Sequence, residues 1–96
     1  MKQQPETAQQ LRRKRLLWRA NHRGMKELDL VIGSFARDNI NTLDDKSLDD
    51  LENILAIADP VMLDMVNRKT VVPDELDNEV MRQIMSKRFT TKDYNK

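Results

Sequence analysis

The residues best suited to chemistry crowd one short segment, residues 23–27, in which an Arg, a Gly and a Glu take the first, second and fifth positions. An Arg guanidinium is planar and pairs bidentately with carboxylates or carbonyls. Two more basic residues and an aspartate stand within four residues of the segment. A charged corner of this kind, exposed at the start of a helix, is suited to docking. The candidate docking residues are Arg19, His22, Arg23, Gly24, Met25, Glu27 and Asp29.

Catalytic chemistry finds little support elsewhere in the sequence. His22 is the only histidine, and no carboxylate or nucleophile stands at a spacing that would pair with it. The acid pairs at 44–45 and 49–50 suit the first turn of a helix, where the helix dipole favours negative charge. There is no cysteine and no glycine-rich phosphate loop. We therefore expect no catalytic residue and no metal site.

The charge of the chain is polarised along its length. Residues 1–27 carry a net charge of +6, whereas residues 28–96 carry −5. A basic head predicts an acidic partner surface or nucleic acid. The basic run at 12–15 has no nucleic-acid-binding motif beside it. A small basic-headed nucleic-acid-binding or regulatory module therefore stays as the alternative function.

The elements that position these residues are predicted to be helices. Ninety-six residues with two glycines indicate one small domain, and apolar residues recur at helical spacing. We predict an all-α fold, a small antiparallel bundle of about five helices over residues 11–88, with flexible tails at 1–10 and 89–96. The predicted helices are Leu11–Asn21, Met25–Asp38, a third with an apolar stripe from Leu48 to Ala58, Pro60–Asn67 and Asp74–Lys87.

Particular residues are assigned to the ends and contacts of these helices. Gly24 is predicted at the turn or cap before the second helix, with Glu27 as the third residue of that helix. Leu17 or Trp18 is expected to anchor the first helix, and Gly33 to allow a close helix contact. The other assignments are Thr42 or Ser47 as cap of the third helix, Asp59 as cap of the fourth with Pro60 as its first residue, and Thr70–Pro73 as an extended connector.

Residues 15–29 closely resemble the signature of a small all-helical family, the bacterial FAD assembly factor SdhE, known in mitochondria as succinate dehydrogenase assembly factor 2. The hallmark of that family is an Arg-Gly-x-x-Glu motif, which stands here as Arg23, Gly24 and Glu27. Trp18 precedes the motif in a basic helix, and an apolar stripe ending at Phe35 follows it. The resemblance covers residues 12–87, and it departs from the family pattern in the fourth helix, at Val61 and Met65.

The resemblance implies an assembly factor that binds the flavoprotein subunit of succinate dehydrogenase, and possibly of fumarate reductase, and promotes its covalent FAD attachment. The flavoprotein catalyses that step itself, so the chain is expected not to be an enzyme. FAD then belongs to the partner and is not stably bound by this chain. A helper of this kind needs only to hold its partner in a reactive arrangement, because orientation alone lowers a barrier.

The expected setting is the bacterial cytoplasm, or the mitochondrial matrix for a eukaryotic protein. The free chain is expected to be a monomer that neither binds nucleic acid nor inserts into a membrane. Arg23 and Glu27 would form charge-assisted hydrogen bonds with the partner, and Gly24 would let the two backbones approach. Two other interpretations stay open, in which the motif only caps a helix, or the chain is itself a flavin transferase.

Overall fold

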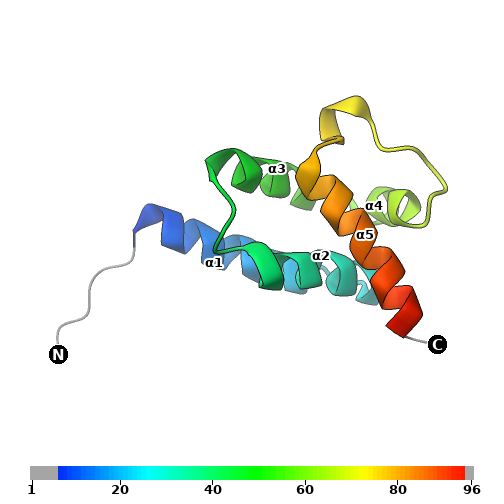
Figure 1. Ribbon diagram of the computed structural model, residues 1–96, viewed down its shortest axis with the longest axis horizontal. Coiled ribbons are helices and arrows are strands. Elements are labelled where there is room, and N and C mark those ends of the chain that lie inside the picture. The colour runs from blue at the N-terminus through cyan, green and yellow to red at the C-terminus, as the bar shows by residue number, and fades with distance from the viewer. Residues whose placement is uncertain (1–6, 95–96) are drawn as a thin grey trace.

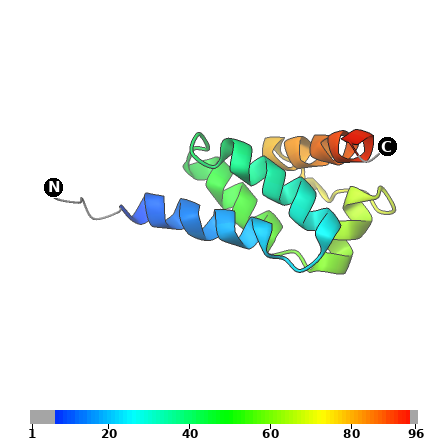
Figure 2. The same ribbon diagram turned by 90° about the horizontal axis from the view of Figure 1, so that it is seen from below.

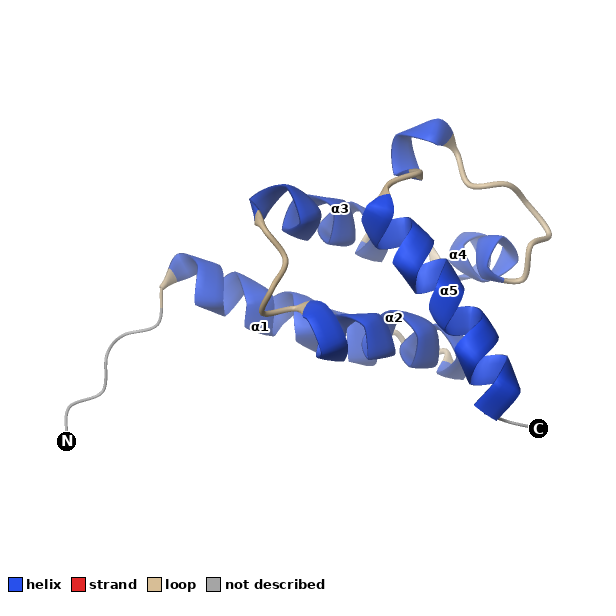
Figure 3. Ribbon diagram, viewed as in Figure 1, coloured by secondary structure: helices blue, strands red, loops and turns tan. Residues whose placement is uncertain are grey.

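The computed structural model describes residues 7–94, with side chains placed as far as Ser86. Within these residues every regular element is a helix (Figure 3), which confirms the predicted all-α class. The elements in chain order are α1 (Ala8–Asn21), α2 (Lys26–Asn39), α3 (Asp45–Leu55), α4 (Asp59–Val66), the 3-10 helix η1 (Asp74–Leu76) and α5 (Glu79–Tyr94).

Helix α1 begins three residues earlier than predicted, inside the segment assigned to a flexible tail. Thr7 and Gln10 form a capping box, in which the Thr7 hydroxyl accepts from the Gln10 backbone N–H and the Gln10 side chain accepts from the Thr7 backbone N–H. Two of the free N–H groups at the helix start are satisfied in this way. Helix α1 and its cap thus extend into the segment predicted as a tail, and residues 1–6 lie outside the described part.

The turn between α1 and α2 places Gly24 at φ +88°, a backbone conformation that L residues rarely adopt. The N-cap of α2 is Met25, which makes no side-chain capping bond. The prediction that Gly24 caps the helix is therefore wrong, and its alternative, a turn position, is confirmed. Glu27 is consequently the second residue of α2 and not the third.

Helix α2 supplies the largest share of the core, and its buried face follows the predicted stripe from Leu28 to Phe35. Gly33 lies on the side of α2 that faces the end of α1. A Cβ atom built at Gly33 would overlap the Asn21 side chain. The predicted close helix contact at this glycine is thus confirmed.

The ends of α3 and α4 differ from their predicted caps. Asp44 caps α3, with its carboxylate accepting from the Ser47 backbone N–H at 2.9 Å. The cap prediction of Thr42 or Ser47 is wrong, because Asp44, which stands between them, directly precedes the first helical residue and its carboxylate is a strong acceptor. Helix α4 has Ala58 as its N-cap, so Asp59 is its first residue and Pro60 its second. The Asp59 carboxylate is used elsewhere, as described below.

The chain after α4 contains the extended connector predicted at Thr70–Pro73, which holds no regular structure. The predicted fifth helix is divided in two. The short η1 comes first, and Asn78 then accepts from the Met81 backbone N–H at 2.9 Å, next to the start of α5. Helix α5 continues to Tyr94, past its predicted end at Lys87 and into the second predicted tail.

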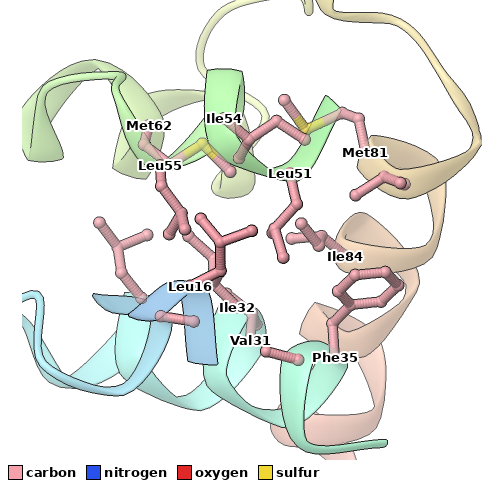
Figure 4. Close-up of a cluster of buried hydrophobic side chains, with 14 of the residues drawn as sticks. Leu16, Val31, Ile32, Phe35, Leu51, Ile54, Leu55, Met62, Met81 and Ile84 are labelled. Carbon is pink, nitrogen blue, oxygen red and sulfur yellow. The ribbon is translucent and has the colours of Figure 1, made fainter. Parts of the chain in front are cut away.

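The helices enclose one apolar core. Helix α2 runs back along α1, α3 packs against α1, and α5 crosses α2 and α3 (Figures 1 and 2). Figure 4 shows labelled apolar side chains of α1, α2, α3, α4 and α5 pointing toward one another between the helices. Those fully or almost fully buried include Leu16, Ile32, Phe35, Leu51, Met62 and Ile84. None of the described helices has the length and apolar character that crossing a membrane requires.

Candidate functional site

The turn between α1 and α2 is held in place by the side chain of Arg23. Its Nε and Nη2 atoms lie 2.9 and 2.6 Å from Oδ1 of Asp59. Nη1 donates to the Leu55 carbonyl at 2.8 Å, and Nη2 donates to the Ile57 carbonyl at 2.5 Å. These carbonyls lie at the end of α3, where helical partners run out. Arg23 therefore joins the α1–α2 turn to the α3–α4 turn.

Arg23 and Asp29 are used inside the molecule. The Arg23 side chain is only 8% exposed, and its backbone N–H donates to the Asp29 carboxylate at 2.9 Å. The sequence predicts that Arg23 bonds to a partner, but in the structure three acceptors of the same chain occupy its guanidinium. Arg23 and Asp29 therefore shape the turn on which the exposed candidate residues stand.

Glu27 and Gly24 form the open part of the corner. Glu27 is exposed on the first turn of α2, and within the described residues it makes no hydrogen bond or ion pair. No atom of the chain lies within 4 Å of the place that a Cβ would take at Gly24. The positive φ explains why a glycine is favoured at this position, although a side chain would meet no other atom there. Another molecule can therefore reach the Gly24 backbone.

The remaining predicted residues surround this corner without forming one cluster. Arg19 is exposed on the last turn of α1 and has no internal partner in the described residues. Met25 is half-buried and packs against the core. His22 is exposed and turns back toward α1. The structure thus leaves Arg19, His22, Gly24 and Glu27 exposed around the turn, and Arg23 and Asp29 hold that turn from within the molecule.

Sequence reasoning missed the exposure of Trp18. Leu17 packs against the core, whereas Trp18 is 61% exposed. Its ring stacks on the His22 ring, with centroids 4.1 Å apart and planes inclined by 9°. The helical spacing contained the signal, because Leu16 and Ala20 are both buried and Trp18 lies between them on the opposite face.

A shallow depression connects the aromatic pair with the Arg23 bridge. Its lining residues are Trp18, Arg19, His22, Arg23, Leu55 and Asp59. Within the described residues no group of three or more His, Asp or Glu side chains is placed to hold a metal ion. The depression offers an aromatic surface and charged groups, which are suited to contact with another molecule.

The basic head has less free charge than its sequence suggests. Arg12 lies 2.6 Å from Asp49 and 2.9 Å from Glu52, and the hydrogen bonds to these carboxylates raise the pKa of Arg12 above its usual value. Arg13 donates to the carbonyls of Ile40 and Leu43. With Arg23 also engaged, three arginines of the head hold the fold together. This arrangement weakens the case for a nucleic-acid-binding head.

A family model described as a flavinator of succinate dehydrogenase matches residues 14–88, which include the exposed corner residues and the Arg23 and Asp29 that support them. The chain belongs to this flavinator family. The resemblance drawn from the Arg-Gly-x-x-Glu motif is thereby confirmed. The match also covers Trp18 and the Arg23–Asp59 bridge, so the whole corner falls within the part that defines the family.

Relatives of this flavinator-family chain occur in bacteria and eukaryotes. The FAD assembly factor SdhE of Acetobacter pasteurianus is 39% identical over 74 residues, which cover 77% of this chain and 68% of that protein. The mitochondrial succinate dehydrogenase assembly factor 2 of Dictyostelium discoideum is 39% identical over 72 residues. The protein of the same name from Arabidopsis thaliana is 30% identical over 64 residues. The aligned regions cover 51% and 34% of these two longer relatives.

Proposed function

We propose that this chain is an assembly factor that binds the flavoprotein subunit of succinate dehydrogenase and promotes the covalent attachment of FAD to it. The names of its family and relatives support this function. The observation that carries the proposal is the state of Glu27, an exposed carboxylate beside a glycine with free space, without a partner in the described chain. Such a group is available to accept hydrogen bonds from another protein.

The corner is suited to this role because it is rigid before binding. Arg23 fixes the turn to the α3–α4 connection through partly buried hydrogen bonds, and Asp29 fixes the backbone of the same turn. A preorganised contact loses little conformational entropy when it binds. Holding the flavoprotein and its FAD in a reactive arrangement accelerates a covalent step without a catalytic group from the helper.

This role has consequences for catalysis, for the choice of partner and for the state of the free chain. The flavoprotein carries FAD and performs the covalent step itself, and this chain is not an enzyme. A fumarate reductase flavoprotein is a second partner, and the free chain is a monomer in the bacterial cytoplasm or the mitochondrial matrix. Mixing the purified chain with FAD and a histidine-containing peptide tests the first point. Covalent flavin in that mixture would contradict it.

The variant Glu27→Ala tests the docking role directly. We expect an unchanged melting temperature, because no internal bond is lost, and a loss of flavinylation measured by in-gel flavin fluorescence of the flavoprotein. Glu75→Ala is the matched control, since Glu75 is also an exposed glutamate in the first turn of a helical element but belongs to η1. We expect that control to support flavinylation normally.

The opposite pattern would refute the docking site. If Glu27→Ala lowers the melting temperature and flavinylation falls only in proportion to the folded protein, the residue serves the helix and not a partner. Equal losses from Glu27→Ala and Glu75→Ala would also argue against a specific corner, because any exposed acid would then matter as much.

A further inference from the structure

One face of α1 carries large apolar side chains into solvent. Leu11, Arg15, Trp18 and His22 follow at helical spacing on the side of α1 opposite the buried Leu16 and Ala20. Leu11 is 41% exposed and Trp18 is 61% exposed. We call Leu11, Arg15, Trp18, Arg19 and His22 the α1 face. Folding of the described chain leaves it uncovered.

The indole at the centre of the α1 face is held in one orientation. His22 stacks against one side of the Trp18 ring, with planes inclined by only 9°. The Nδ1 atom of His22 lies 2.7 Å from the Trp18 carbonyl oxygen, and because a carbonyl only accepts, Nδ1 carries the proton. A fixed aromatic side chain binds at low entropic cost, which is why Trp is enriched among residues that dominate interfaces.

Two free guanidinium groups flank the indole. Arg15 and Arg19 are exposed and have no hydrogen bond or ion pair within the described residues, whereas Arg12, which lines a depression together with both, is bonded to Asp49 and Glu52. Arginine and tryptophan together are typical of the centre of protein interfaces. The face therefore fits a partner surface that presents carboxylates around an apolar hollow.

We propose that the α1 face is a second contact for the same flavoprotein, docking on an acidic surface of that subunit with Trp18 as its anchor. This inference rests on the proposed function. The face continues directly into the corner, because His22 is the C-cap of α1 and stands two residues before Gly24. One partner lying across the turn would cover both.

A protein fits this face better than a nucleic acid does. One side of the indole is covered by His22, so bases have only one side on which to stack. The Glu27 carboxylate at the adjoining corner has no internal partner in the described residues, so it repels phosphate but can accept hydrogen bonds from a protein. These features suit a protein surface with donors opposite Glu27 and carboxylates opposite Arg15 and Arg19.

The experiment uses the fact that Trp18 is the only tryptophan of the chain. The full chain is labelled with 5-fluorotryptophan, which gives one 19F resonance from Trp18, and is titrated with the flavoprotein subunit. We expect that resonance to shift or broaden on binding. We also expect Trp18→Ala to raise the Kd by about 30-fold, the scale of an interface hot spot, without lowering the melting temperature.

Charge and apolar controls complete the test. Arg15→Glu combined with Arg19→Glu should raise the Kd and reduce the dependence of association on salt. Val71→Ala is the apolar control, because Val71 is 86% exposed on the connector after α4. We expect that variant to bind like the unmodified chain.

The outcomes of the titration distinguish a failure of the α1 face from a failure of the proposed function. If Trp18→Ala binds normally while Glu27→Ala does not, the α1 face is not a contact, although the proposed function stands. If the unmodified chain fails to bind the flavoprotein at all, the proposed function fails and the inference fails with it. A 19F resonance that responds to RNA but not to the flavoprotein would assign the face to nucleic acid and overturn the proposal.

Discussion

Residues of a single motif have opposite environments in this molecule. The Arg23 side chain is almost fully buried and bonded to three acceptors of its own chain, whereas Glu27 is exposed and has no internal partner among the described residues. Gly24 lies between them in a backbone conformation that suits glycine. Stability and recognition therefore depend on different members of the motif, and substitutions can separate them.

Arg23→Ala removes the link between the two turns. It leaves the carbonyls of Leu55 and Ile57 without their donor and Asp59 without its counter-charge. We expect the free energy of unfolding to fall by about 2–3 kcal/mol, measured by urea denaturation. Arg19→Ala is the control, because the exposed Arg19 has no internal partner in the described chain. Equal unfolding midpoints for the two variants would contradict the structural role of Arg23.

Gly24→Ala separates backbone strain from contact with a partner. Because the space beside Gly24 is free, the substitution causes no clash inside the chain, and the positive φ alone costs about 1 kcal/mol of stability. Gly24→Asn should cost less, since Asn tolerates such a backbone better. If the flavoprotein approaches this position, both variants lose binding to a greater degree than stability. Binding that follows the melting temperature in both would show that no partner comes close.

At the scale of elements, hydrophobic periodicity predicted that the helices exist. Their exact ends were harder to predict, because these depend on capping hydrogen bonds. Helix α2 has the clearest stripe and was placed within one residue at each end. The start of α1 was missed because Thr7 and Gln10 satisfy each other, which overrides the polar character of that segment. Caps depend on which of several neighbouring oxygens reaches a free N–H, as Asp44 does for Ser47, and spacing alone does not decide this.

The cap of α3 makes part of the stability depend on pH. Hydrogen bonds from Ser47, first from its backbone N–H, hold the pKa of the Asp44 carboxyl below its usual range. A folded-state pKa below the unfolded value stabilises the fold at neutral pH, and this contribution is lost as pH falls through the folded pKa. In Asp44→Asn the cap keeps an acceptor but does not titrate. We therefore expect the variant to melt below the unmodified chain at neutral pH, and the difference to shrink as the pH falls below the usual range of an aspartate. A constant difference would contradict this.

At the scale of the whole molecule, the sequence indicates where the candidate corner lies but not which of its side chains are exposed. Motif and charge indicated residues 23–27, but the direction of each side chain depends on elements far away in sequence. Arg23 meets Asp59 across 36 residues, a pairing that no local pattern contains. The net charge of the head likewise overstated its free cations, because Arg12 and Arg13 turn toward α3 and the loop before it.

The corner also depends on the single core beneath it, and this gives a last prediction. Ile84 of α5 is fully buried against the side chains of the other helices (Figure 4), so Ile84→Ala should cost about 3 kcal/mol of stability. That is a large share of the total for a small domain. We expect one cooperative transition, observed both by circular dichroism and by Trp18 fluorescence, because α1 and α5 contribute to the same core.

This variant should behave in the opposite way to Glu27→Ala. Ile84 is fully buried and is not one of the corner residues. Each folded molecule should therefore bind the flavoprotein with an unchanged Kd, and flavinylation should fall only with the folded fraction. Both quantities can be measured at a low temperature, where the variant stays folded, and again near its melting temperature. Loss of binding by fully folded Ile84→Ala would mean that α5 itself shapes the partner contact, and the separation between core and corner would then be wrong.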